Sequence, residues 1–244
     1  MENKKFELCS DVKPWTDNII LHRIRALKDF VCDGIFIRKG DKGGFVQSEQ
    51  NLSQDGNCWI FGNAVAMEDS TVKDNASLHD QAMIFDKSIV CDNASLYNFT
   101  AMFDKSMSAG NSVLSGHAKM HAQSVIIDNA CIGGCAIACD NCIISGNAKV
   151  QGNTIIHGSA SVSGNSKLFA YMEIGGDAKI ESLSDVIILG LVGPDADDCT
   201  FYKNTSNSIS AYYKGEIIPI EILEEDPYMN PHKEIIRIVK QIIV

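Results

Sequence analysis

The sequence predicts an all-β fold built around a parallel β-helix, and three observations predict it. From Asn57 to Ile188 the chain divides into twenty-two consecutive six-residue units without an insertion or deletion. In nearly every unit the second place is small, the fourth is usually aliphatic and the sixth is most often Gly, Asp or Asn. An asparagine also recurs at every third unit. A period held this strictly indicates one structural unit stacked on itself.

Each unit is expected to be a short strand followed by a corner. The second and fourth places are separated by one residue, so their side chains point to the same side of an extended strand and are buried together. Ala148 and Val150 are one such pair. The sixth place carries the residue types that tolerate a positive φ and turn the chain. Cys58 and Cys142 take the small inward place, and we expect free thiols throughout.

The asparagines show how many units close one coil. They recur every eighteen residues, at Asn57, Asn75, Asn93, Asn111, Asn129, Asn147 and Asn165. Only an eighteen-residue coil would stack them, so that their side-chain amides form a hydrogen-bonded ladder. Three strands per coil make a triangular prism. At about 4.8 Å of rise for each coil, the rod is expected to be roughly 35 Å long.

The two ends of the chain depart from the repeat. Residues 1–56 contain short β-rich runs and turns, which suit a cap over the first coil because open strand edges invite association. Residues 57–188 form the β-helix. In residues 189–244 we expect strands at Cys199 to Lys203 and Ser208 to Leu223, then a helix starting near Pro231. That helix is so apolar that it must dock, over the last coil or against another subunit.

Unbroken hexads of this kind resemble the left-handed parallel β-helix of the bacterial hexapeptide-repeat proteins. The left hand is implied by this resemblance, since parallel crossovers are usually right-handed.

The head adds a second resemblance. Arg23 to Asp29, then Lys39 to Ser53 with its Gly-Gly-Phe-Val and Asn-Leu-Ser segments, running into Trp59, resembles the start of YdcK-like proteins. These are bacterial and phage-encoded chains in which a similar head precedes Gly-Asn-Ala repeats. The resemblance covers roughly residues 20 to 188, and it implies a fold and a phage or mobile-element origin but no activity.

Composition narrows the classes of partner. The formal net charge is −10, and the excess of acids lies in the rod and the tail. This disfavours binding to nucleic-acid phosphates, which needs clustered Lys and Arg. No apolar run is long enough to span a bilayer and no signal core follows the first charges, so we expect a cytoplasmic protein with no membrane contact. No phosphate-binding or hydrolase motif is present, and no cofactor is expected.

An acyltransferase is the alternative that the repeat suggests. Many hexapeptide-repeat proteins are trimeric, acyl-CoA-dependent transferases in which a His between subunits acts as a general base, often beside a loop that interrupts the coils. Here His121 or His157 would take that role. However, no loop interrupts the hexads, and Gly152 and Gly164 follow the aliphatic residue by two places rather than one.

Outward positions supply the remaining candidates. His121, Cys139 and His157 are spaced by eighteen residues, so they stack on successive coils, where they could share a metal ion, contact a subunit or have no role. Phe85, Phe99 and Phe103 are predicted to lie exposed on one face, as interface residues do.

Acidic residues also recur at two of the corners. A row of carboxylates could mimic nucleic-acid phosphates for a basic protein or bind calcium. Alternatively, Asp simply replaces Gly where the corner needs a permissive residue.

The function that these observations favour is a non-catalytic binding or scaffold protein that acts through one face of the rod. We expect a homo-oligomer or a complex with another protein. Acyl transfer and inhibition of a basic protein remain the two alternatives.

Overall fold

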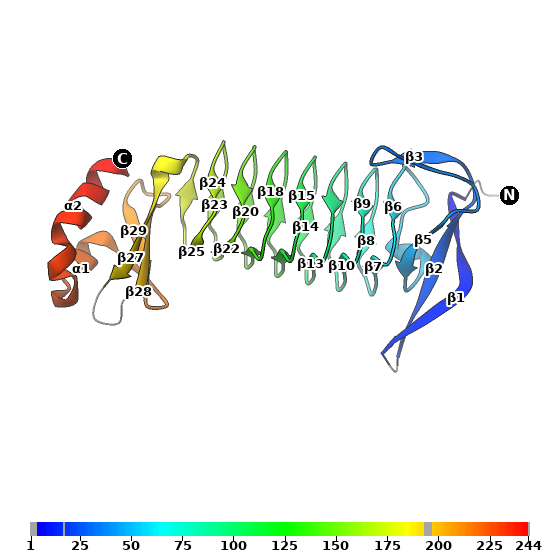
Figure 1. Cartoon of the computed structure of the whole chain (residues 1–244), viewed down its shortest axis with the longest axis horizontal. Coiled ribbons are helices and arrows are strands. Elements are labelled where there is room, and N and C mark those ends of the chain that lie inside the picture. The colour runs from blue at the N-terminus through cyan, green and yellow to red at the C-terminus, as the bar shows by residue number, and fades with distance from the viewer. Residues whose placement is uncertain (1–3, 17, 193–196, 244) are drawn as a thin grey trace.

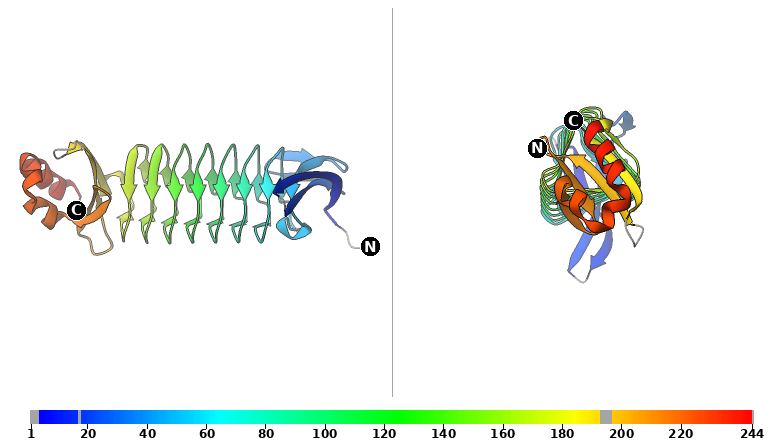
Figure 2. Two further views of the ribbon diagram at one scale, coloured as in Figure 1. Left: turned by 90° about the horizontal axis from the view of Figure 1, so that it is seen from below. Right: turned by 90° about the vertical axis from the view of Figure 1, so that its left-hand side faces the viewer.

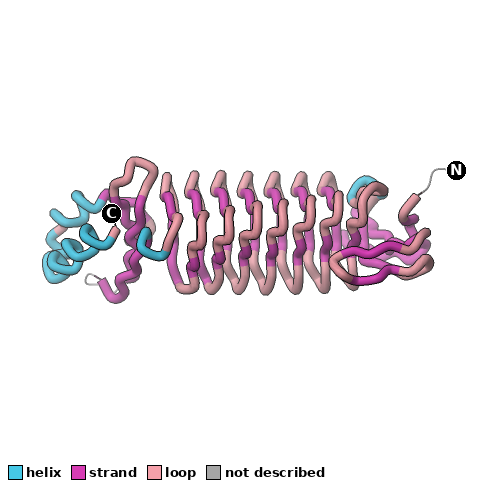
Figure 3. The backbone as a smooth tube through the Cα atoms, turned by 90° about the horizontal axis from the view of Figure 1, so that it is seen from above, coloured by secondary structure: helices cyan, strands magenta, loops and turns pink. Residues whose placement is uncertain are grey.

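The computed structural model describes residues 4–16, 18–192 and 197–243, and it confirms the predicted fold class. Figure 1 shows a straight parallel β-solenoid between two different end modules. Strands lie on three sides of each coil and loops form the corners (Figure 3). The functional candidates of the sequence therefore lie on flat, regularly spaced surfaces.

Three parallel sheets make up the solenoid, and from β6 onward each strand pairs with the strand eighteen residues further on, as Met83 does with Ala101. The first sheet contains β5 (Lys42–Val46), β7 (Val65–Ala66), β10 (Met83–Ile84), β13 (Ala101–Met102), β16 (Lys119–Met120), β19 (Ile137–Ala138), β22 (Asn153–Ile156) and β25 (Tyr171–Ile174). The second contains β8 (Thr71–Val72), β11 (Ile89–Val90), β14 (Met107–Ser108), β17 (Val125–Ile126), β20 (Ile143–Ile144), β23 (Ser161–Val162) and β26 (Lys179–Ile180). The third contains β6 (Trp59–Ile60), β9 (Ser77–Leu78), β12 (Ser95–Leu96), β15 (Val113–Leu114), β18 (Cys131–Ile132), β21 (Lys149–Val150) and β24 (Lys167–Leu168).

The interior is filled by the second and fourth places of each hexad, as predicted. Ala148 and Val150 are buried, and Cys58 and Cys142 lie inward among them. The predicted asparagine ladder is confirmed from Asn75 to Asn165, where each side-chain amide donates to the next at 3.0–3.2 Å. The eighteen-residue coil therefore has a hydrogen-bonded spine along one corner.

The solenoid begins earlier than the sequence indicated. β5 pairs in parallel with β7, Phe45 opposite Val65, and Leu52 bridges to Val72. Both pairs are twenty residues apart, so this first coil is two residues longer than the others and its period is hidden. The short helix η1 (Glu49–Asn51) turns one of its corners. Residues 42–56, assigned to the cap from the sequence, therefore belong to the rod.

Two hairpins make up the rest of the head. β1 (Phe6–Thr16) and β2 (Ile19–Ala26) extend the first sheet as an antiparallel arm that projects beyond the outline of the coils (Figure 2). β3 (Phe30–Cys32) and β4 (Ile35–Ile37) form the second hairpin. Its Phe30 meets Trp59 edge to face, with ring centroids 5.4 Å apart, which buries that outward tryptophan.

A small antiparallel sheet closes the other end. It follows η2 (Leu183–Asp185) and comprises β27 (Val186–Val192), β28 (Asp197–Lys203), β29 (Ile209–Tyr213) and β30 (Glu216–Pro219). Tyr202 on β28 joins the core of the rod, and Asn204 bridges to Ala178. The parallel coils thus end at β26, before residue 188. Residues 193–196, near the predicted boundary, lie outside the described residues.

The last elements are α1 (Ile220–Glu225), η3 (Pro227–His232) and α2 (Lys233–Ile242). The strand expected to run to Leu223 instead ends at Pro219, where α1 begins. The terminal helix does dock, but on the outer side of the antiparallel sheet, through Ile236 and Val239, and not on the last coil (Figure 1). No helix in the described part of the chain is long and apolar enough to cross a membrane.

Candidate functional site

The outward side of the first sheet is an apolar surface bordered by rings, which we call the aromatic face. The parallel register places its side chains in three columns, one coil apart. The middle column contains Val65, Met83, Ala101, Lys119, Ile137, Ile155 and Glu173. Lys119 and Glu173 are its charged members. Most of this face therefore offers hydrocarbon rather than charge to a partner.

One border of the aromatic face is a ladder of stacked rings. The centroids of Phe85 and Phe103 lie 5.1 Å apart with planes 5° from parallel, and those of Phe103 and His121 lie 4.9 Å apart at 5°. The coil repeat imposes this geometry, because equivalent places of successive coils are about 4.8 Å apart. The rings support one another and present their edges outward.

The opposite border carries a shorter stack. Phe99 and His117 lie 4.9 Å apart and 7° from parallel. The structure thus places Phe85, Phe99 and Phe103 on the same face, with Phe99 across the strand from the other two. Phe99 is exposed, whereas Phe85 and Phe103, predicted to be exposed, are partly buried. Their role as interface residues stays a prediction.

A hollow of about 470 Å³ separates the projecting arm from the start of the aromatic face. Lys13 lines it beside two rings: its Nζ lies 5.4 Å from the centroid of Trp15 and 5.7 Å from that of Phe45. The lining residues are Lys13, Trp15, Phe45, Asn63, Val65, Gln81, Met83 and Phe99. The arm and the aromatic face therefore form one continuous surface.

At its other end the aromatic face meets the C-terminal module. His157 Nε2 lies 3.3 Å from the Glu173 carboxylate, off the line of a good hydrogen bond, and its ring meets Tyr212 edge to face at 5.9 Å. Burial and the Glu173 carboxylate raise the pKa of Tyr212 to about 12. A β-carbon at position 175 would lie 2.2 Å from the His157 ring, so Gly175 is required there. His157 is part of the joint between rod and module.

The predicted metal ladder of His121, Cys139 and His157 does occupy one outward column. Among the described residues, however, the three side chains do not bring their ligand atoms within 4.8 Å of one another. His121 stacks on Phe103, and the Cys139 thiol donates to the carbonyl of Ile156. Burial, with Asp140 and Glu173 nearby, raises the pKa of Cys139 to about 11, which disfavours the thiolate that zinc binds.

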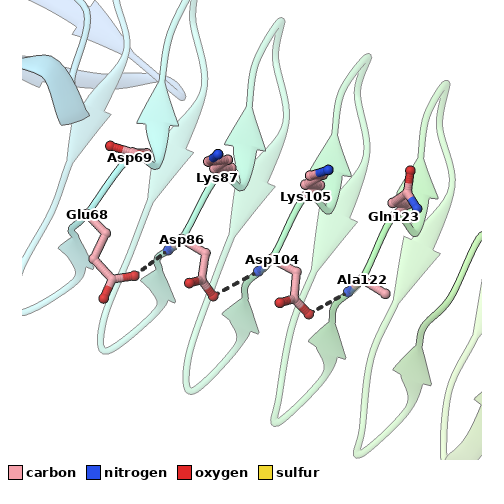
Figure 4. A pocket seen from close by; sticks show the side chains of 8 residues that line it. All are labelled: Glu68, Asp69, Asp86, Lys87, Asp104, Lys105, Ala122 and Gln123. Atoms are coloured by element: carbon pink, nitrogen blue, oxygen red, sulfur yellow. Dashed lines mark hydrogen bonds between the residues drawn. The ribbon is translucent and has the colours of Figure 1, made fainter.

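The acidic corners have a structural role that the sequence did not reveal. Figure 4 shows Glu68, Asp86 and Asp104 in one row, each accepting a hydrogen bond from the backbone N–H of the next corner, at 2.8, 3.0 and 2.9 Å. Ala122 interrupts the row, which resumes at Asp140, whose carboxylate accepts from the Gly158 N–H at 2.9 Å. A parallel row beside it includes Lys87 and Lys105. The carboxylates bridge successive coils, and the corner carries both signs of charge rather than a phosphate-like array.

These corners also have the permissive backbone that the sequence indicated. Asp86, Asp104 and Ala122 have φ of 55°, 58° and 58°. Asp is among the few types that enter this region without a large penalty, since its short polar side chain bonds locally. Backbone requirement and coil bridging together explain the acidic row.

Sequence reasoning missed a polar latch between the second hairpin and the rod. His79 is stacked between Phe61 and Tyr97, at 4.4 and 4.5 Å. Asp33, in the turn of the β3–β4 hairpin, lies 3.0 Å from His79 Nε2 and accepts a hydrogen bond from the Tyr97 hydroxyl. Burial lowers the pKa of His79 and, with the Asp33 bond, raises that of Tyr97 to about 12. Asp33 and His79 are forty-six positions apart in the sequence, and no repeat links them.

A second missed group seals the first coil. Lys5 is fully buried, and its ammonium donates to the carbonyls of Cys58 at 2.9 Å and Asp55 at 3.3 Å, with the Cys58 sulfur at 3.1 Å. Burial lowers the pKa of Lys5 and raises that of Cys58. This lysine satisfies acceptors at the open end of the solenoid.

Comparison of the chain with protein-family models and with curated proteins gives no match. The solenoid is consistent with a hexapeptide-repeat protein, and the YdcK-like resemblance stays a prediction.

Proposed function

We propose that this chain is a non-catalytic binding or scaffold protein whose contact surface is the aromatic face together with the arm. The observation that carries the proposal is the strip bordered by rings, in which Phe85, Phe103 and His121 stack along one edge and Phe99 and His117 along the other. Met83, Ala101 and the exposed Lys119 lie between the two edges. Apolar patches with aromatic members, rimmed by polar groups, mark interfaces between proteins.

The β-solenoid reduces the conformational entropy that such a surface loses on binding. Backbone hydrogen bonds between coils and a filled interior hold the strands rigidly, so the side chains lose little further freedom when a partner binds. A pre-organised surface binds more tightly for the same area. The partner in this proposal is another protein, or a further copy of the chain.

Two exposed phenylalanines allow a matched test. Phe99 on the aromatic face is 50% exposed, and Phe169, at the far end of the third sheet, is 52% exposed. Wild-type, Phe99→Asp and Phe169→Asp chains are used as baits in a lysate of the native host. The proposal expects a discrete partner with wild type and Phe169→Asp, and a loss of about tenfold or more with Phe99→Asp. Equal capture by all three baits would contradict it.

The acyltransferase alternative makes a different prediction. Between β6 and β26, a stretch that the structure describes completely, no loop interrupts the coils, and His157 is packed under Tyr212. A thermal-shift screen of acyl-CoAs, nucleotides and divalent metals tests it. A shift with acyl-CoA, lost on His121→Ala in a trimeric protein, would favour acyl transfer over the scaffold.

A further inference from the structure

One group of metal-ligating side chains converges away from the aromatic face. Asp74 and Asp92 occupy the same corner of two successive coils, between the second and third sheets, and Cys91 directly precedes Asp92 at the end of β11. One ligand atom of each residue, the sulfur or a carboxylate oxygen, lies within 4.8 Å of the other two. Among the described residues, no other group of three or more His, Cys, Asp or Glu side chains converges in this way.

The Cys91 thiol distinguishes this group from an ordinary acidic corner. Cys91 is only 8% exposed, and in the part of the chain that the structure describes its sulfur has no hydrogen-bond partner. By contrast, the sulfur of Cys58 donates to the carbonyl of Val72, and that of Cys139 to the carbonyl of Ile156. A buried polar group without a partner in a folded protein indicates a missing ligand, such as an ion.

The two carboxylates keep oxygen atoms available for an ion. Asp74 accepts a hydrogen bond from the backbone N–H of Asp92 at 3.3 Å, and Asp92 accepts one from the N–H of Gly110 at 2.9 Å. Both bonds are made to Oδ2, so the other oxygen of each carboxylate remains a possible ligand. Both side chains are exposed, and an ion can therefore enter from solvent.

The charges around the thiol favour a cation. Burial raises the pKa of Cys91, and the carboxylates of Asp92 and Asp74 raise it further, whereas Lys73 acts in the opposite direction. The thiol is therefore protonated in the metal-free protein. A divalent cation reverses this balance, because a thiol that coordinates a metal ion loses its proton.

The mixture of sulfur and oxygen ligands indicates which cation fits. Calcium and magnesium take oxygen ligands, whereas zinc binds both thiolate, at about 2.3 Å, and carboxylate, at about 2.0–2.2 Å. Three protein ligands leave the fourth position of a tetrahedral zinc ion to water.

We propose that Asp74, Cys91 and Asp92 form a zinc site on the corner between the second and third sheets. When zinc binds, the Cys91 thiol releases its proton to solvent, and the sulfur and one oxygen of each carboxylate coordinate the ion. The ion links two successive coils beside the amide ladder, where Asn75 donates to Asn93. The site goes beyond the proposed function, because it shares no residue with the aromatic face.

Metal titration of the full chain, stripped of metal with a chelator and kept reduced with a phosphine, tests the proposal. Cobalt(II) serves as the spectroscopic probe for the zinc position, since a thiolate ligand adds a sulfur-to-metal charge-transfer absorption. We expect this absorption in the wild type, saturating at about one ion per chain, and its loss when zinc displaces cobalt. Isothermal titration with zinc gives the affinity.

Two variants each remove one ligand and preserve the corner. Cys91→Ala fits the fold, because Ala109 takes the equivalent place on the next coil. Asp92→Asn keeps the bond between coils, as Asn98 does at another corner by accepting from the Gly116 N–H at 3.1 Å. Cys91→Ala should abolish the charge-transfer absorption, and each variant should weaken zinc binding about tenfold or more.

The matched controls are Asp128→Asn and Cys135→Ala. Asp128 lies in the same column and accepts from the Gly146 N–H at 2.9 Å, but Ile127 stands in the place of Cys91. Cys135 is an exposed thiol. Neither change should alter the zinc affinity. A wild type that binds neither ion would overturn the proposal, and so would a charge-transfer absorption that persists in Cys91→Ala or a site that calcium fills equally well.

Discussion

Lys5 illustrates how one buried side chain can determine the stability of an open-ended fold. The first coil of a solenoid has no coil before it, so its carbonyls need donors from elsewhere. Lys5 supplies three N–H groups on one flexible stem and places them at that end. The cost is a desolvated ammonium, which is why its pKa is lowered.

Replacing Lys5 with Met should therefore leave buried acceptors without a donor. We expect the free energy of unfolding to fall by about 1–3 kcal/mol, measured by urea denaturation. Lys4→Met is the control, because Lys4 pairs with Glu49 at the surface, where an ion pair contributes about 0–1 kcal/mol. Equal stability of Lys5→Met and wild type would show that the buried bonds contribute nothing net.

His79 gives the latch a pH dependence. Its folded pKa is lowered by burial, although Asp33 and Asp80 act in the opposite direction. The unfolded chain, with a pKa of about 6.5, then binds protons more readily than the folded one. Stability from neutral His79 is complete above about pH 6.5 and is lost as the pH falls toward the lowered folded pKa.

Thermal melts between about pH 7.5 and pH 5 measure this loss against a His79→Phe variant. Phe can stack between Phe61 and Tyr97 but does not titrate, so the variant should lose less stability on acidification. Identical pH profiles for the two proteins would exclude His79 as the source.

At each corner the residue must adopt a positive φ, and its side chain can also bond to the next coil. Ala122 occupies a left-handed conformation with φ of 58°. Unlike Gly it carries a β-carbon, and unlike Asp it has no polar side chain that can bond locally. Its N–H donates to the Asp104 carboxylate, but its own side chain has no acceptor for the N–H of the next corner, so it interrupts the row. The strain at this position comes from the β-carbon alone.

Ala122→Gly should consequently stabilise the protein by about 0.5–1 kcal/mol. This is the strain relieved in the folded state, reduced by the conformational entropy that glycine adds to the unfolded chain. The matched control is Ala118→Gly four residues earlier, an inward and fully buried alanine, which should destabilise. Differential scanning calorimetry measures both, and a lowered melting temperature for Ala122→Gly would contradict the account of the corner.

Local sequence periodicity explains which elements could be predicted. The rod from β6 to β26 follows from hexads alone, because each residue's environment is set by its place in the repeat. The sequence did not reveal the first coil, because its two extra residues break the period. It did not reveal the contact of Asp33 with His79 either, because no repeat relates these two positions. The aromatic face was only partly predicted: its columns follow from the spacing of eighteen, but ring stacking and the covering arm depend on tertiary packing.

At the scale of the whole molecule, the chain is a rigid rod with different chemistry at its ends and along its sides. The arm extends the aromatic face at one end, and the antiparallel sheet with its two helices closes the other (Figure 2). A scaffold that holds a partner along one side of the rod would have this organisation.

Site-specific photo-crosslinking tests the role of the aromatic face most directly. Benzoylphenylalanine replaces Phe99 on that face or, in a matched chain, Phe169 on the third sheet, and adducts formed in the native host are resolved by mass. We expect a discrete adduct from position 99 and none from position 169. No adduct from position 99, or the same adducts from both positions, would contradict the assignment of the aromatic face as the contact surface.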